Sequence, residues 1–139
     1  MKSTPIFAII IAISIPIIVT AKMRSVGVRG TVICDGTPIS NGEVELYDER
    51  NAARADALLA KTKTDANGRF TIKGNSKRSR FDPHFTISHK CRAKLCTRKM
   101  LLRVPEKYTT SGPNPSEIYD IGVIDAKIKF PTETKTCPI

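Results

Sequence analysis

The stretch AKTKTDANGRF, residues 60–70, decides the fold of this 139-residue chain. It predicts a strand, a polar turn and the start of a second strand. In the turn we expect the Asp65 side chain to cap backbone N–H groups and Asn67-Gly68 to adopt positive φ, because Asn and Gly tolerate that region. Phe70 then enters the core. The stretch therefore predicts a β-hairpin.

Segments with alternating apolar side chains lie on both sides of this turn. In VGVRGTVIC (26–34), Val26, Val28, Val32 and Cys34 share one parity, which predicts a strand with one buried face. The other segments of this kind are EVELY (43–47), RFTIK (69–73), HFTISHKC (84–91), KMLLRV (99–104) and IYDIGVIDAKIKF (118–130). In the last of them the parity changes near Gly122, which predicts a bulge or bend.

One segment has helical composition. ERNAARADALLA (49–60) is too short and too weakly periodic for more than a helical turn or two. The sequence therefore predicts an all-β protein, an antiparallel two-sheet β-sandwich of about seven to eight strands with at most one short helix.

The N-terminus, MKSTPIFAIIIAISIPIIVTA, has the layout of a secretory signal peptide. Lys2 is followed by an apolar run over residues 6–19 and by small residues up to Ala21. An uncleaved membrane anchor is the alternative, but the run is too short to span a bilayer comfortably. We expect cleavage after residue 21, which leaves residues 22–139 as one secreted domain without a transmembrane anchor. Loss of Lys2 lowers the formal charge from +10 to +9.

The four cysteines, Cys34, Cys91, Cys96 and Cys137, all lie in this domain. An even count in a secreted chain predicts disulfides, and four cysteines allow three pairings. The short spacing in CRAKLC favours a Cys91–Cys96 bridge, which leaves Cys34–Cys137 to tie the first strand to the C-terminus. A zinc site is disfavoured because the close Cys or His pairs of structural zinc sites are missing. We expect no metal.

A series of longer motifs runs along the domain. In order, they are LLAKTKTDANGRF (58–70), ISHKC (87–91) with a second cysteine five residues on, VPEKYTTSGPNP (104–115), YDIG (119–122) and KFPTETKTCPI (129–139). Together they cover nearly all of residues 22–139 and resemble the nematode transthyretin-like family of small secreted proteins. The resemblance implies a transthyretin-like, or prealbumin-like, β-sandwich.

Catalysis is disfavoured by the residues present. Hydrolases of 5-hydroxyisourate resemble transthyretin and use a His and Arg cluster with a C-terminal Tyr-Arg-Gly-Ser, whereas this chain ends in TKTCPI. Of its two histidines, His89 shares the parity of Phe85 and predicts a core or sheet residue, while His84 predicts a strand-entry residue. Ser111 has no adjacent motif that would activate a nucleophile. We predict no enzyme and no cofactor, with a hydrolase as the less favoured alternative.

A carrier of a small hydrophobic ligand is the other alternative function. Transthyretin holds its hormone in a channel between paired dimers, and that channel belongs to the assembly rather than to the fold. The apolar positions of this sequence are accounted for by a sandwich core.

The remaining signal is positive charge. Ten Lys and Arg residues lie between Lys73 and Arg103, with Asp82 as the single acid there. They are either a solubilising surface or an attraction for an extracellular protein, an acidic lipid or an anionic glycan. Secretion and the lack of a known motif disfavour nucleic acid. We predict a secreted binding or signalling module that contacts a cell-surface or extracellular partner through Lys73, Lys77, Arg78, Arg80, Lys90, Arg92, Lys94 and Arg98.

Overall fold

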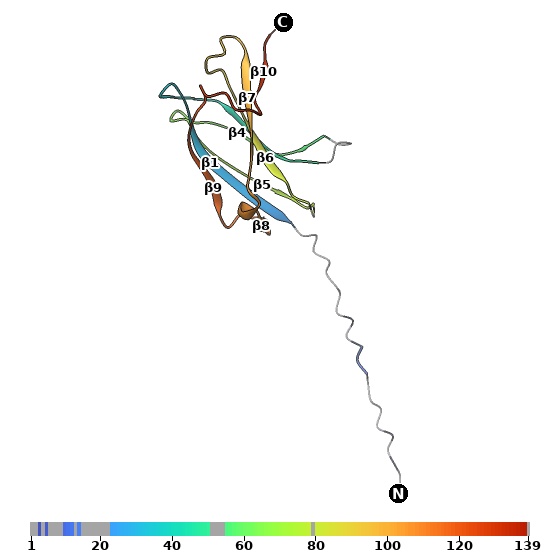
Figure 1. Cartoon of the computed structure of the whole chain (residues 1–139). Helices are drawn as coiled ribbons and strands as arrows, with labels where there is room; N and C mark the ends of the chain where they lie inside the picture. The colour runs from blue at the N-terminus through green and yellow to red at the C-terminus, as the bar shows by residue number, and fades with distance from the viewer. Residues whose placement is uncertain are drawn as a thin grey trace.

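The computed structural model describes residues 23–50, 55–78 and 80–138, with isolated positions among the first 22. The predicted signal peptide lies outside the described ranges, and no helix among the described residues is long and apolar enough to cross a membrane. In chain order the elements (Figure 1) are β1 (Arg24–Cys34), β2 (Thr37–Pro38), β3 (Glu43–Asp48), β4 (Ala57–Lys63), β5 (Arg69–Ser76), β6 (Pro83–His89), β7 (Thr97–Arg103), the 3-10 turn η1 (Glu106–Tyr108), β8 (Thr110–Ser111), β9 (Ile118–Asp125) and β10 (Thr134–Thr136).

These strands form two sheets of a sandwich (Figure 1). One sheet has the order β2-β1-β5, with β8 and β9 also paired to β1, and the other has the order β10-β7-β6-β3-β4. Every pairing is antiparallel except that of β1 with β9. The predicted class is confirmed, but the described residues form ten strands rather than the predicted seven to eight. The parallel pair was not foreseen, because side chains alternate with the same period in both kinds of pairing.

The core between the sheets consists of the side chains that the alternation placed inward. Val26, Val28 and Val32 of β1 are fully buried, as are Phe85 and Ile87 of β6. Full burial of each such side chain stabilises the fold by roughly 2 kcal/mol. The other buried hydrophobic side chains of this cluster are Val44, Leu46, Phe70, Ile72, Cys91, Met100, Val104 and Ala126.

The turn between β4 and β5 has the predicted Asp65 cap, but Gly68 adopts positive φ and Asn67 does not, and the turn joins the two sheets. Asp65 Oδ1 accepts the backbone N–H groups of Asn67 and Arg69, each at 2.9 Å. Gly68 has a φ of 74°, and a Cβ atom there would collide with the Val32 carbonyl oxygen. Because β4 pairs with β3 and β5 pairs with β1, the predicted β-hairpin is wrong. The turn carries the chain from one sheet to the other.

The bulge in β9 is confirmed. Between the partners of Arg29 and Thr31, β9 inserts Ile121 and Gly122 opposite the single residue Gly30. Gly122 has a φ of 70°, which glycine adopts without steric penalty.

The segment of helical composition contains no helix where it is described. Ala57–Lys63 form β4, and residues 51–54 lie outside the described ranges. An isolated helix of this length is marginal, whereas pairing with β3 satisfies the backbone groups of the segment. Among the described residues, helical structure is limited to η1.

All four cysteines are disulfide-bonded, as predicted, but the predicted pairing is wrong. Cys34, at the end of β1, bonds to Cys91, which follows β6. Cys96 bonds to Cys137 near the C-terminus. The first bridge therefore connects the two sheets, and the second fastens the C-terminal strand beside β7.

The register of β10 explains the second bridge. Thr97 of β7 pairs with Thr136 of β10. One step further along this ladder, Cys96 faces Cys137 with their Cα atoms 4.2 Å apart. A Cα separation this short is that of two residues directly opposite each other on antiparallel strands.

Strand register also explains why Cys91 and Cys96 do not pair. They would face each other if the β6–β7 ladder continued, but its last pair is His89 with Arg98. The chain then turns through two residues in the left-handed region.

Candidate functional site

Six of the eight predicted partner-binding residues lie in two surface groups at opposite ends of the sandwich. The group before β6 is Lys77, Arg78 and Arg80. The group after β6 is Lys90, Arg92 and Lys94. A seven-residue strand separates them by about 20 Å. The other two residues belong to neither group, because Lys73 is exposed on β5 and Arg98 is buried. The basic residues that lie close together in the sequence therefore do not form one cluster in space.

The group after β6 belongs to a larger cationic surface. Lys127, Lys129 and Lys135 of the C-terminal segment line two shallow pockets together with Arg92 and Lys94. Sequence patterns could not point to these three lysines, because their position depends on the pairing of β10 with β7. We define the basic end as Lys90, Arg92, Lys94, Lys127, Lys129 and Lys135.

Two carboxylates neutralise part of the basic end. Arg92 binds Asp35 through two bonds, Nε to Oδ2 at 2.9 Å and Nη2 to Oδ1 at 2.7 Å. Lys127 Nζ lies 3.7 Å from Asp125 Oδ2. Hydrogen bonds, first from the Lys127 backbone N–H, hold the pKa of Asp125 below its ordinary value. Six cations less two acids leave an excess of four positive charges among the described residues.

The loop 91–96 at this end is fixed by a disulfide at each of its ends. Cys91 is bonded to β1, and Cys96 is bonded to the C-terminal segment. Between them Arg92 and Lys94 adopt positive φ, 51° and 53°. This conformation costs a non-glycine residue about 1–2 kcal/mol and is kept where the surroundings enforce it. The loop is therefore preorganised, with its charges facing solvent.

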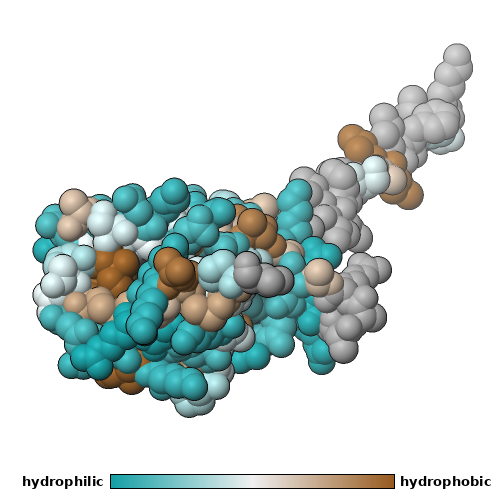
Figure 2. Space-filling view, turned by 90° about the horizontal axis from the view of Figure 1, so that it is seen from above, coloured by the Kyte–Doolittle hydropathy of each residue, from teal (hydrophilic) through white to brown (hydrophobic). Residues whose placement is uncertain are grey.

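Exposed apolar side chains accompany these charges. Leu95 of the loop is 77% exposed, and Ile128, between two lysines of the basic end, is 56% exposed. Figure 2 looks at the molecule from above relative to Figure 1 and shows a mainly hydrophilic surface with separate hydrophobic patches. Large exposed apolar side chains beside cations are typical of surfaces that contact a partner or a membrane.

Arg98 is not available to a partner, contrary to the prediction. Arg98 is 7% exposed, and its guanidinium binds both carboxylate oxygens of Glu133 and donates to the Cys91 carbonyl oxygen at 2.8 Å. The reason is parity, because Arg98 shares the inward face of β7 with Met100. The Arg98 hydrogen bond holds the pKa of Glu133 below its ordinary value. This buried ion pair connects β7 to Cys91 and to the C-terminal segment, which carry the cations of the basic end.

The two histidines have structural partners. His89 is 4% exposed, and its Nδ1 accepts the Cys91 backbone N–H at 3.1 Å, which confirms it as a core residue. His84, the second residue of β6, stacks on Tyr47 and lies 3.5 Å from Asp56. Among the described residues, no serine, threonine or tyrosine hydroxyl is hydrogen-bonded to either histidine.

Burial of His89 predicts a loss of stability in mild acid. Desolvation first, and the Arg98 charge second, lower the pKa of His89. The unfolded chain therefore binds a proton more readily than the folded one, so the free energy of unfolding falls as the pH drops below about 6.5. Denaturant titrations at pH 7.5 and 5.0 should show this fall. His89→Asn keeps an acceptor for Cys91 but does not titrate, and its stability should change less between these pH values. An equal fall in both proteins would contradict the assignment.

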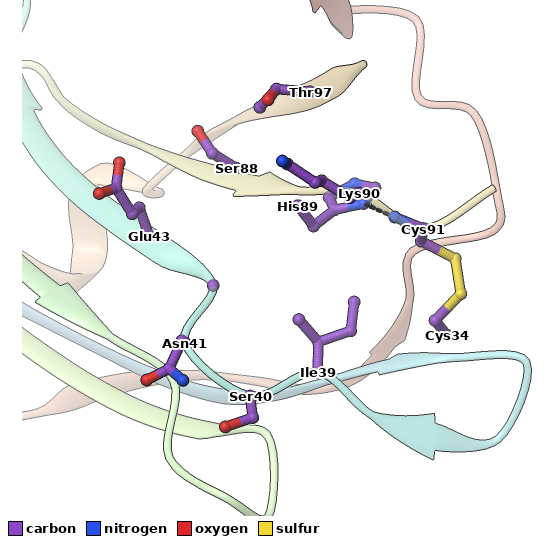
Figure 3. Close-up of a pocket in the computed structure, with 11 residues that line it drawn as sticks. Cys34, Ile39, Ser40, Asn41, Glu43, Ser88, His89, Lys90, Cys91 and Thr97 are labelled. Atoms are coloured by element: carbon purple, nitrogen blue, oxygen red, sulfur yellow. Dashed lines mark hydrogen bonds between the residues drawn. A yellow bond between two sulfur atoms is a disulfide. The ribbon is translucent and has the colours of Figure 1, made fainter. Parts of the chain in front are cut away.

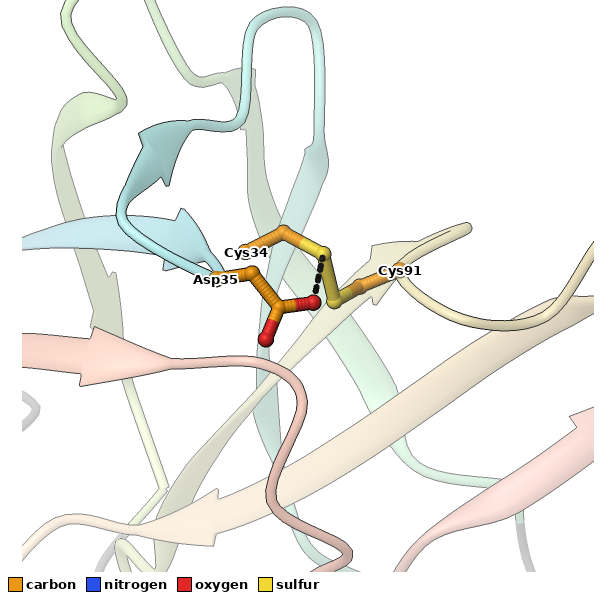
Figure 4. A group of neighbouring side chains, drawn as sticks. All are labelled: Cys34, Asp35 and Cys91. Atoms are coloured by element: carbon orange, nitrogen blue, oxygen red, sulfur yellow. Dashed lines mark hydrogen bonds between the residues drawn. A yellow bond between two sulfur atoms is a disulfide. The ribbon is translucent and has the colours of Figure 1, made fainter.

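Cys34, Asp35 and Cys91 come together in a group with the composition of a metal site (Figure 4). The two sulfur atoms are joined in the disulfide and are not thiolate ligands. Asp35 is bound to Arg92. This group does not fit a metal ion.

A pocket of about 450 Å³ lies where the segment between β2 and β3 approaches the end of β6 (Figure 3). Ile39 and the Cys34–Cys91 disulfide form an apolar side, while Glu43 and Lys90 bring opposite charges to it. Its volume lies within the range of small-molecule sites.

The fold and site define a disulfide-bridged β-sandwich with a cationic end. The family model of the transthyretin-like family (TTR-52) matches residues 29–105. Three relatives from Caenorhabditis elegans are transthyretin-like protein 5, with 39% identity over 82% of this chain and 84% of the relative; protein 33, with 35% over 82% of both; and protein 2, with 31% over 84% of both. The chain belongs to the transthyretin-like family.

A solved structure with a similar region is a 9R-lipoxygenase from Cyanothece. The match has a TM-score of 0.44 and 19% identity, and covers 73% of this chain but 16% of the lipoxygenase. A similarity of this size carries no argument about function.

Proposed function

We propose that this protein is a secreted, non-catalytic binding module that docks onto acidic membrane surfaces of cells through its basic end. The observation that carries the proposal is the loop 91–96, which is closed by a disulfide on each side and presents two cations and Leu95 to solvent. Secretion is supported by the two disulfides, which require an oxidising compartment, and by the layout of the N-terminus.

The expected strength of docking follows from charge and apolar area. Each cation near an anionic membrane contributes about 1 kcal/mol. The four unneutralised charges of the basic end therefore contribute about 4 kcal/mol, and insertion of Leu95 adds roughly 2 kcal/mol. The sum supports weak, reversible binding.

Leu95 favours a lipid surface over a glycan. Sulfated glycans offer charge but no apolar phase, so an exposed leucine gains nothing from them. At a membrane the same side chain enters the boundary between head groups and acyl chains.

The second candidate function is that of a carrier for a small ligand, and the pocket in Figure 3 supports it. A carrier retains its ligand through gentle purification, which native mass spectrometry detects as added mass. A membrane-docking module is purified without such a mass.

Charge reversal at the basic end should abolish membrane docking. The variant Lys94→Glu/Lys129→Glu/Lys135→Glu removes three contributions and adds repulsion, so affinity for vesicles rich in acidic phospholipid should fall by about a hundredfold or more. Vesicle co-sedimentation measures this, and binding of the native protein should weaken from low to physiological salt because exposed charges are screened.

The matched control is Lys73→Glu/Lys77→Glu/Lys107→Glu, which makes the same change in net charge at exposed positions away from the basic end. It should keep most of the binding. Leu95→Ser should weaken binding to vesicles but not to heparin. Equal losses of vesicle binding in both triple variants would mean that only the net charge of the protein matters. Binding to heparin but not to vesicles would mean that the partner is an anionic glycan and not a membrane.

A further inference from the structure

The end opposite the basic end carries a groove of about 650 Å³. It lies where β1 and β6 begin and where β3, β5 and β7 end, at the end that holds β8 in Figure 1. These elements bring four arginines to its lining, and none of them belongs to the basic end: Arg24, Arg50, Arg78 and Arg80.

Three acids around this groove are paired with arginines, two of them with the same one. Arg103, which is not part of the lining, forms salt bridges with Glu49 and Asp82. Arg78 Nη1 binds the buried Asp48 carboxylate at 3.0 Å. Arg78 and Asp48 therefore cancel, whereas Glu49 and Asp82 share Arg103 and leave one negative charge beside the groove.

The other three arginines have no acidic partner. Arg24, Arg50 and Arg80 form no salt bridge within the described ranges. The Nε atoms of Arg24 and Arg50 are buried and lack an acceptor there. Arg24 uses Nη2 for a bond to Thr109 Oγ1 at 2.5 Å. Against these three cations stand Glu106 and the one negative charge left by Glu49, Asp82 and Arg103, so the groove keeps an excess of one positive charge among the described residues.

An apolar surface adjoins the arginines. Phe81, Pro83 and Val104 line the same groove. Pro83 is fully buried, Val104 is 5% exposed, and Phe81 is half-buried and packs against the core. The groove thus combines a cationic wall with a surface on which an apolar or ring-shaped group can lie.

From this arrangement we infer that the groove binds a small phosphate or sulfate ester carried on an apolar or ring-shaped body. The fork of N–H donors on a guanidinium matches the oxygens of phosphate and sulfate groups. A phosphate monoester carries nearly two negative charges at neutral pH, and the groove offers it three guanidinium groups without an acidic partner. The volume lies within the range of small-molecule sites. This site is independent of the membrane-docking surface.

Calorimetric titration of the purified protein at low salt tests the site with three probes of the same shape: 4-nitrophenyl phosphate, 4-nitrophenyl sulfate and uncharged 4-nitrophenol. We expect binding of at least one ester, and its identity distinguishes phosphate from sulfate. Arg80→Gln should weaken the binding of that ester by about tenfold, which corresponds to the loss of one hydrogen bond to a charged group. Arg24→Gln should act similarly, and Lys129→Gln, at the basic end, should change nothing.

Arg80 is exposed and has no hydrogen bond among the described residues, so its variant keeps the fold. Vesicle binding should be the same in Arg80→Gln and in the native protein, which separates failure of this site from failure of the proposed function. Binding of 4-nitrophenol as tight as that of an ester, no binding of either ester at millimolar concentration, or an unchanged Arg80→Gln variant would each overturn the inference.

Discussion

Replacement of Glu133 by Gln, or of Arg98 by Met, should lower the free energy of unfolding by about 3–5 kcal/mol. The side chains of both residues are less than a tenth exposed, at 8% for Arg98 and 4% for Glu133. Loss of one partner leaves the other as a buried charge without compensation, and that penalty is larger than the net value of the pair itself. Urea denaturation followed by circular dichroism measures the change, since the chain has no tryptophan.

The matched control is the double variant Arg98→Met/Glu133→Leu. Both charges are absent there, and apolar side chains of similar volume fill the space, so stability should recover most of the loss, short of the hydrogen bonds that Arg98 makes to the Cys91 and Ile128 carbonyl oxygens. A cost below about 1 kcal/mol for each single variant would mean that the pair is solvated rather than buried.

Removal of the pair should also disturb the basic end. Arg98 donates to the carbonyl oxygens of Cys91 at 2.8 Å and of Ile128 at 3.3 Å. It therefore connects β7 to both segments that carry the exposed cations. Weaker vesicle binding is expected even in the double variant, because Met offers no donor to either carbonyl oxygen.

The alternation of the sequence indicates that Arg98 faces inward, but it does not indicate which residue binds Arg98. Alternation along β7 gives Arg98 the parity of Met100, and a cation with that parity requires a buried acid. That acid, Glu133, comes 35 residues later in a segment without strand periodicity. Local patterns predict which way a side chain faces, whereas a long-range contact depends on register that the sequence does not display.

The same distinction covers the rest of the fold. The alternation of side chains correctly predicted the core positions of β1 and β6, the bulge at Gly122 and the burial of His89. Each of these features depends on a few adjacent residues. The sheet change after β4 and the position of β10 depend on pairing between distant strands. The cationic cluster was misread for a related reason, since a strand that separates two basic groups places them at opposite ends of the molecule.

Removal of either disulfide should destabilise the protein by about 4 kcal/mol, because the bridges close loops of similar size, 57 and 41 residues apart in sequence. The effect acts mainly through the unfolded chain, which gains freedom when a bridge is lost. We expect Cys34→Ala/Cys91→Ala to be the more damaging pair. Cys91 is buried, and its bridge joins the two sheets, so a cavity adds to the lost constraint.

The pair Cys96→Ala/Cys137→Ala should have a different signature. β10 is exposed along its whole length, so the C-terminal segment can detach without opening the core. Its loss frees one end of the loop 91–96 and moves Lys135 away from Arg92, so vesicle binding should fall further than with the other pair. Denaturant titration and vesicle co-sedimentation on both variants measure the contrast, after peptide mapping of the native protein under non-reducing conditions. A Cys91–Cys96 peptide in that map, or native stability in either variant, would contradict the pairing from which the rigidity of the basic end is argued.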